Sequence, residues 1–123
     1  MRIVIAAFQT AVRAALQAFL QEKLQPEEVS GVSNSRELMA RLDLECSNVI
    51  LLLDYALPDG SVTALLAALR ARAVRPKVIV LGSAPDQRRA ARAAGADDFV
   101  IQSDPPRRLL SAIRSVQMEQ GDD

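Results

Sequence analysis

The chain of 123 residues has no histidine, no tryptophan and one cysteine, Cys46. Without histidine it lacks the most common general base and metal ligand among the amino acids. One cysteine excludes an internal disulfide framework, and a free thiol is typical of a reducing compartment, so we expect a cytoplasmic protein. No basic residue stands beside Cys46 to favour a reactive thiolate, so we expect a structural role or none for it.

Aromatic residues make up 3% of the chain, and no apolar run is long enough for a membrane span. The core must therefore be built from aliphatic side chains, and half of the chain is apolar, which is enough for one domain. Neither sign of charge predominates, because 15 Lys and Arg side chains balance 15 Asp and Glu side chains. The composition thus gives no indication of a nucleic-acid or membrane partner.

Short runs rich in β-branched and aliphatic residues alternate with longer segments that have the apolar spacing of helices. Three of these runs are apolar throughout, which is typical of strands buried on both faces in a parallel sheet. The predicted strands are residues 2–6, 28–32, 49–53, 77–81 and 99–101.

Capping residues mark the ends of the intervening helices. Asn34, with Glu37 three residues later, has the pattern of a capping box, and the proline after Asp104 suits the first turn of a helix. The residues expected to cap or open the helices are Thr10, Asn34, Ser61, Ser83 with Pro85, and Asp104 with Pro105. The helices are expected to stop before Pro26, Pro76 and Gly95, where Gly95 suits a left-handed C-cap.

Five repeats of strand and helix predict one α/β domain with a five-stranded parallel sheet. Right-handed crossovers place the first and fifth helices on one face and the other three on the opposite face, with strand order 2-1-3-4-5. We assign residues 1–118 to this domain and residues 119–123 to a polar tail or the start of a linker. Functional side chains are expected where the strands end, at the carboxyl edge of the sheet.

Three segments of the sequence resemble the receiver domains of bacterial response regulators. An apolar run ends in Asp54 and is followed by Tyr-Ala-Leu-Pro-Asp-Gly, as in the phosphoacceptor segment of that family. Residues 1–5 with Val12 and Arg13 are similar to the family's first strand and helix, and residues 94–101, with their Ala-Gly-Ala-Asp start, to its approach to strand five. The resemblance implies the flavodoxin-like receiver fold.

The phosphoryl chemistry of this family requires residues that the chain lacks. The resemblance implies an acidic pair that holds a divalent cation after the first strand, but the residues there are Ala7 and Phe8. The lysine expected after strand five is Gln102. The hydroxyl residue expected after strand four is Gly82, with Ser83 beside it.

The other matching residues have a structural as well as a functional interpretation. Asp54 matches the phosphoacceptor, but without metal ligands we expect an unmodified carboxylate that accepts hydrogen bonds from backbone N–H groups. Ser83 is expected to cap a helix and Asp59 to lie in a turn. Phe99 matches the family's switch aromatic, although core packing also explains an aromatic residue on a strand.

We predict a degenerate receiver, or pseudo-receiver, that acts in signal transduction by binding a protein partner without phosphorylation, metal, cofactor or enzymatic activity. By the resemblance, the binding surface is the fourth helix, fifth strand and fifth helix. Its charges of both signs could pair across the twofold axis of a homodimer, or form an ordinary solvated surface. The charged residues concerned are Arg88, Arg89, Arg92, Asp97, Asp98, Arg107 and Arg114.

Two other functions fit the same sequence. In the first, Asp54 accepts a phosphoryl group with unusual metal ligation, which makes the chain a weak enzyme because receivers catalyse their own phosphorylation. In the second, Ala7 and Phe8 turn the former phosphate site into an apolar pocket for a small ligand. Titration with Mg²⁺ tests the first function, and thermal-shift screening tests the second.

Overall fold

The structure is a computed structural model that describes residues 1–44 and 49–121, and for residues 119–121 the backbone alone. Cys46 lies outside the described residues, so the prediction for it stays a prediction. The elements alternate strictly between strand and helix along the chain. They are β1 (Arg2–Ala6), α1 (Thr10–Leu24), β2 (Glu28–Val32), α2 (Ser35–Asp43), β3 (Ile50–Asp54), α3 (Val62–Arg70), β4 (Lys77–Gly82), α4 (Pro85–Ala93), β5 (Asp98–Ile101) and α5 (Pro106–Gly121).

The five strands form one parallel sheet in the order β2-β1-β3-β4-β5, as predicted. β3 is displaced by one residue from the prediction, so that Asp54 is its last residue, and β4 continues to Gly82. The register places Asp54 beside Leu81 and Gly82 beside Ile101. The ends of β3, β4 and β5 therefore lie side by side at the carboxyl edge of the sheet.

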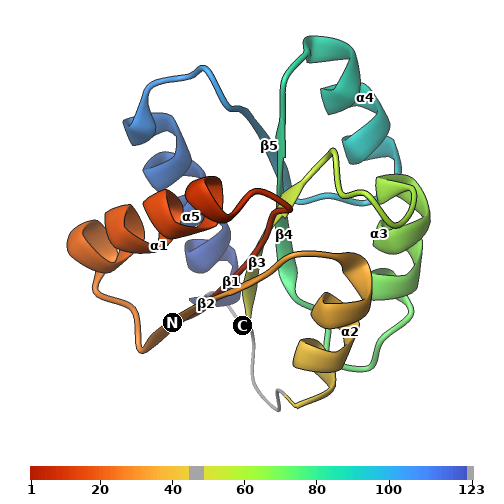
Figure 1. Cartoon of the computed structure of the whole chain (residues 1–123), viewed down its shortest axis with the longest axis horizontal. Helices are drawn as coiled ribbons and strands as arrows, with labels where there is room; N and C mark the ends of the chain where they lie inside the picture. Colours follow the sequence, from red (N-terminus) through yellow and green to blue (C-terminus); the bar gives the residue numbers. More distant parts are fainter. Residues whose placement is uncertain (45–48, 122–123) are drawn as a thin grey trace.

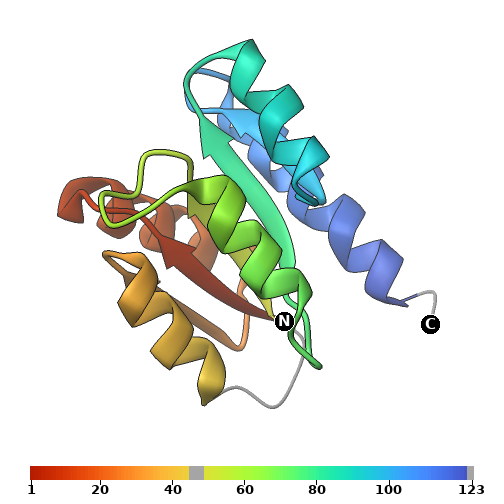
Figure 2. The ribbon, with the colours of Figure 1, turned by 90° about the vertical axis from the view of Figure 1, so that its right-hand side faces the viewer.

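Helices cover both faces of the sheet, in the arrangement expected from the sequence (Figure 1). α1 and α5 cover one face, where Leu20, Ile113 and Val116 pack on Ile3, Ile5 and other strand residues. Figure 2 shows the opposite face, with α2, α3 and α4 side by side in front of the sheet. Their buried side chains include Leu38, Leu66, Leu69 and Ala91. Both faces of β3 are buried, which explains its uninterrupted run of apolar residues.

Two of the five predicted helix caps are present in the structure. Asn34 accepts a hydrogen bond from the Glu37 N–H at 2.8 Å, and Ser61 accepts one from the Ala64 N–H. The other three caps were predicted wrongly. α1 begins at Thr10 with Gln9 as its cap, α4 begins at Pro85 with Ala84 as its cap, and α5 begins at Pro106, two residues after Asp104. Thr10 accepts a hydrogen bond from Arg13 instead of capping the helix.

Gly95 ends α4 in the left-handed conformation that the sequence predicts, with φ +108°. The Gly95 N–H donates to the Arg92 carbonyl and the Ala96 N–H to the Ala91 carbonyl, which is the Schellman pattern. A side chain at this position would also collide with Arg70.

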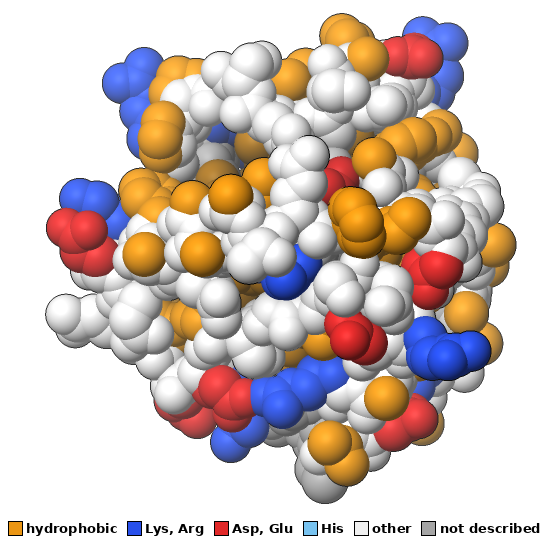
Figure 3. Space-filling view, viewed as in Figure 1, with side chains coloured by type: hydrophobic (Ala, Val, Ile, Leu, Met, Phe, Trp, Pro, Cys, Tyr) orange, Lys and Arg blue, Asp and Glu red, His pale blue; other side chains and the backbone are white. Residues whose placement is uncertain are grey.

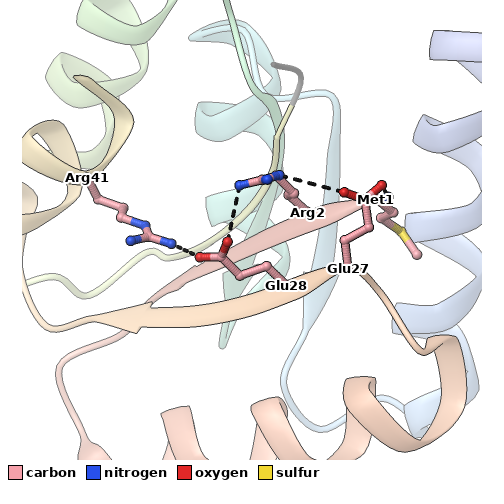
Figure 4. A network of polar contacts seen from close by, with 5 residues as sticks. All are labelled: Met1, Arg2, Glu27, Glu28 and Arg41. Atoms are coloured by element: carbon pink, nitrogen blue, oxygen red, sulfur yellow. Dashed lines mark hydrogen bonds and ion pairs between the residues drawn. The ribbon is translucent and has the colours of Figure 1, made fainter. Parts of the chain in front are cut away.

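A network of charged residues joins β1, β2 and α2 at the opposite, amino edge of the sheet (Figure 4). The carboxylate of Glu28 binds both Arg2 and Arg41. The amino group of Met1 lies 3.3 Å from the carboxylate of Glu27. These pairs stabilise the edge strand β2 at a distance from the carboxyl edge, where the candidate site lies.

The helices in the described part of the chain are all too short or too polar to cross a membrane. α5 extends as far as Gly121 and therefore includes part of the predicted polar tail.

We expect Asn34→Ala to lower the free energy of unfolding by about 1 kcal/mol, because it removes the side-chain acceptor for the Glu37 N–H at the start of α2. Asn34→Ser, which keeps an oxygen acceptor, should cost clearly less. Urea unfolding of the two variants measures the difference, and equal losses would show that the cap contributes nothing.

Candidate functional site

The residues that resemble the receiver site lie at the carboxyl edge of the sheet, as the sequence predicts. We call them the Asp54 corner, which consists of Ala7, Phe8, Asp54, Gly82 and Gln102. Neighbouring strands bring them together, because β1, β3, β4 and β5 are consecutive in the sheet. The Gln102 N–H donates to the Gly82 carbonyl at 2.8 Å, which joins the ends of β4 and β5 directly.

Asp54 is partly exposed, and its carboxylate has one hydrogen bond with the residues that the structure describes. Its Oδ1 accepts from the Ala56 N–H at 2.9 Å. This is the kind of backbone contact that a purely structural aspartate was expected to make. Among residues 1–44 and 49–121, no Lys or Arg side chain forms an ion pair with the Asp54 carboxylate.

Ala7 and Phe8 leave only backbone oxygens at the positions of the acidic pair. The Ala7 methyl group is buried, whereas the Phe8 ring is 60% exposed. Both carbonyls accept hydrogen bonds from Nη1 of Arg13, at 2.6 Å and 2.8 Å. The sequence analysis did not assign this role to Arg13. The signal for it is Gly31, which leaves room for the Arg13 side chain, because a Cβ at residue 31 would lie 3.1 Å from Cδ of Arg13.

The residues present do not fit a divalent cation of the kind that receiver domains bind. Mg²⁺ prefers carboxylate and other oxygen ligands, and Asp54 is the single carboxylate of the Asp54 corner. The carbonyls of Ala7 and Phe8 already accept from a guanidinium group that carries its own positive charge. In the described part of the chain there is no cluster of three or more His, Cys, Asp or Glu residues that could hold a metal ion.

Gly82 lies directly beneath the ring of Phe99, which is fully buried. A Cβ at residue 82 would lie 2.5 Å from Cζ of Phe99 and 2.7 Å from its Cε2, much closer than atoms in a protein approach. The ring therefore occupies the space that a hydroxyl side chain at this position would need. Arg88 of α4 covers the ring from outside, with its guanidinium carbon 5.6 Å from the ring centroid.

Gln87 occupies the other side of the same space. Its Oε1 accepts hydrogen bonds from the backbone N–H groups of Ser83, at 2.8 Å, and Ala84, at 3.4 Å. The same oxygen would lie 2.5 Å from a Cβ at residue 82. The N–H groups of the two residues before α4 are thus satisfied from within the chain, and the exposed side chain of Ser83 does not cap the helix.

Gln102 is exposed and forms one wall of an apolar cavity of about 470 Å³ between α1 and α5. Val12, Leu16 and Phe19 of α1 line its other side. Figure 3 shows hydrophobic side chains gathered where these two helices face each other. Neither Ala7 nor Phe8 lines this cavity, so the apolar space lies beside the Asp54 corner rather than in it.

Asp59 has a larger role than the predicted turn residue. Its carboxylate accepts from the Ser35 N–H at 2.8 Å and the Arg36 N–H at 3.3 Å, so it caps α2 from the loop that follows Asp54. The Ser35 N–H is the main reason why the pKa of Asp59 is lowered from its ordinary value of 3.8. The Ser33 hydroxyl is the main reason why the pKa of Glu37 is lowered from 4.5.

The charged residues of α4, β5 and α5 are partly paired within the chain. Asp98 accepts from Arg92 at 3.2 Å and from Arg108 at 3.3 Å, and Arg108 was not in the predicted set. Asp97 accepts from the Val78 N–H at 2.8 Å. The arginines of this surface that are exposed and form no ion pair with described residues are Arg88, Arg89, Arg107 and Arg114.

Residues 3–114 match the model of the response regulator receiver domain family. The chain belongs to this family. The match begins within β1, includes the other four strands and reaches into α5, and the family agrees with the sheet order described above. Receiver domains of this family act in two-component signalling. No curated protein sequence matches the chain significantly.

Solved receiver domains have the same fold over nearly their whole length. A CheY-like receiver domain protein from Methanospirillum hungatei JF-1 is 28% identical, with a TM-score of 0.83 over 98% of this chain and 96% of the other. The receiver domain of TorR, a regulator of the TMAO respiratory system, is 22% identical, with a TM-score of 0.81 over 97% and 98%. The BeF3-activated receiver domain of DrrB is 23% identical, with a TM-score of 0.75 over 93% and 94%.

Acid should weaken the link between Asp59 and α2. Because the pKa of Asp59 is lowered on folding, its contribution to stability is complete above the ordinary value of 3.8 and is lost as the pH falls through the lower folded value. We expect Asp59→Asn to reduce the loss of stability on acidification below about pH 4. Urea unfolding across this pH range measures it, and an unchanged pH dependence in the variant would contradict the assignment.

Proposed function

We propose that this receiver domain acts as a pseudo-receiver, a protein-interaction module that works without phosphorylation and without enzymatic activity. The observation that carries the proposal is the contact between Gly82 and Phe99. It bears on the conformational change by which a receiver responds to phosphate, and it is independent of the missing metal ligands.

The charges of the Asp54 corner support the proposal. A phosphoryl group on Asp54 would add negative charge to a carboxylate that forms no ion pair with a Lys or Arg of the described residues. Such charge needs a metal ion or cationic donors to offset it. The guanidinium group of Arg13, at the end of β1, already donates to the carbonyls of Ala7 and Phe8. Gln102 offers a neutral amide where the family has a lysine, and Phe8 adds apolar surface. Phosphorylation of Asp54 is therefore unfavourable.

The position of Phe99 supports the second part of the proposal. In the family, phosphate draws the strand-four hydroxyl inward and the aromatic residue of strand five follows it. Here residue 82 has no hydroxyl, and the Phe99 ring already fills the space above it. A signal needs two states that a ligand can distinguish, and this arrangement favours one state throughout.

The surface presented in that one state is formed by α4, β5 and α5, next to the Phe99 ring. Arg88 lies over the ring, and Arg92 and Arg108 hold Asp98 beside it. We propose that a protein partner, either another protein or a second copy of this chain, binds this surface constitutively.

Acetyl phosphate with Mg²⁺ should leave the mass of the protein unchanged, because Asp54 lacks the cations that a phosphoryl group requires. Intact-mass spectrometry tests this, with Asp54→Asn as the matched control. A mass increase of one phosphoryl group in the wild type that is absent from Asp54→Asn would establish the alternative function, a working phosphoacceptor.

Gly82→Ala should lower the free energy of unfolding by about 1–3 kcal/mol, because the added methyl group overlaps the Phe99 ring. In a Phe99→Leu background, which lacks the overlapping ring atoms, the same substitution should cost much less. A double-mutant cycle by urea unfolding measures the coupling, with Gln87→Ala as a third background to separate the contribution of the Gln87 side chain. A coupling near zero would show that Gly82 does not determine the position of Phe99.

A further inference from the structure

A second cavity lies at the amino edge of the sheet, at the opposite end of β4 from the Asp54 corner. Its volume of about 300 Å³ is at the lower end of the range for small-molecule sites. The end of α3, the loop to β4, the start of β4 and the turn between α4 and β5 form its walls. Because a strand rises about 3.3 Å per residue, Lys77 at this end of β4 lies about 16 Å from Gly82 at the other end. The cavity is therefore separate from the Asp54 corner.

Three of the side chains that line this cavity are positively charged. Arg70 is the last residue of α3, Arg75 lies in the loop, and Lys77 is the first residue of β4. Asp97 is the one carboxylate among the described lining residues. Its Oδ2 accepts from the Val78 N–H at 2.8 Å, which holds it to the start of β4. Three cations against one carboxylate leave an excess of two positive charges, in a chain that is neutral as a whole.

The two arginines of the cavity are exposed and keep their hydrogen-bond donors. Within residues 1–44 and 49–121, neither Arg70 nor Arg75 forms a hydrogen bond or an ion pair. Arg72, which lies between them in the sequence, differs because it pairs with Asp43 at 2.9 Å. A guanidinium group presents its donors in a planar fork that matches the oxygens of a phosphate group. The cavity thus has two such groups available to an anion.

Gly95 determines where the Arg70 side chain lies. A Cβ at residue 95 would lie 2.4 Å from Cδ of Arg70 and 3.1 Å from its Nη1, so this side chain occupies space that only a glycine leaves open. Arg70 therefore extends from the end of α3 to the turn after α4, along the wall of the cavity. A side chain that is already ordered loses less conformational entropy when it binds a ligand.

The arginines also have a structural explanation, which is that they offset the partial negative charge at the carboxyl ends of α3 and α4. Both helix ends already have backbone caps. The N–H groups of the two residues after Arg70 donate to carbonyls of α3, and those of Gly95 and Ala96 donate to carbonyls of α4. Neither Arg70 nor Arg75 donates to a carbonyl of the described residues. Capping therefore does not account for the two arginines.

From these observations we infer that the cavity binds a small phosphate anion, either free phosphate or the phosphate group of a small ester. A phosphate group carries a charge close to −2 at neutral pH, which matches the excess positive charge of the lining. Its oxygens can accept from both guanidinium groups at once. The volume also has room for an ester of a few carbon atoms. The site lies outside the Asp54 corner, so the inference goes beyond the proposed function and does not depend on it.

The test is a titration of the full chain, labelled with ¹⁵N, with glycerol 3-phosphate and separately with inorganic phosphate, at constant ionic strength. We expect both to shift the amide signals of the cavity residues in a saturable manner, and glycerol to have no effect. Succinate, whose two charges lie on separate carboxylates, should bind at least tenfold more weakly. Tighter binding of the ester would identify an organic phosphate as the ligand, and equal or tighter binding of inorganic phosphate would identify the free anion.

The variant Arg70→Gln with Arg75→Gln should weaken the binding of both phosphates at least tenfold. Arg75→Gln alone changes an exposed loop residue that makes no contact of its own, and it should weaken binding about threefold. The matched control is Lys23→Gln with Arg36→Gln, which removes the same charge from α1 and α2. The control should weaken binding no more than twofold.

Four results would overturn the inference. They are the absence of saturable binding, equal losses in the double variant and its control, binding of succinate as tight as that of the phosphates, and signal shifts at the Asp54 corner instead of the cavity. The mass measurement with acetyl phosphate reports on Asp54 alone. This inference and the proposed function can therefore fail independently of each other.

Discussion

The absence of a side chain at Gly82 is the constraint on which the rest of the carboxyl edge depends. The Phe99 ring can lie where it does because residue 82 has no Cβ, since a Cβ there would overlap two atoms of the ring. The ring in turn supports Arg88, and the strand that carries it supplies Asp98 to Arg92 and Arg108. The buried packing at the end of β4 is thus connected to the charged surface of α4, β5 and α5.

The loops around Asp54 are held by protein groups throughout. Arg13 binds the carbonyls of the loop between β1 and α1, and Asp59 joins the loop after β3 to the start of α2. Gln87 satisfies the N–H groups before α4. Each contact satisfies backbone groups that would otherwise be exposed at the edge of the sheet, and none requires a metal ion or a phosphoryl group.

The fold could be predicted from the sequence because it depends on periodic features. Buried runs such as residues 50–53 and capping residues such as Asn34 and Ser61 act within a few positions. The site was predictable only in part. Gly82 was recognised as the position of a lost hydroxyl, but the ring that fills its space comes from another strand.

The missed contacts have the same physical cause. Asp59 and Ser35 are 24 residues apart in the chain, and Arg108 and Asp98 are 10 apart, so local spacing does not reveal either pair. Ser83 does not cap α4, since Ala84 lies between it and the helix, and the amide oxygen of Gln87 instead accepts from the N–H groups of Ser83 and Ala84. Side chains that satisfy the backbone of a distant loop become visible only once the strands are ordered.

The conformation of Phe99 in solution tests the central claim most directly. The ring and methyl signals around Phe99 can be recorded by NMR for the free protein and again with Mg²⁺ and beryllium fluoride, a mimic of the phosphoryl group. The account predicts one set of signals, with the ring in contact with Gly82, that is the same in both samples. A second ring position in the free protein, or signals of β4 and β5 that move when the mimic is added, would contradict it.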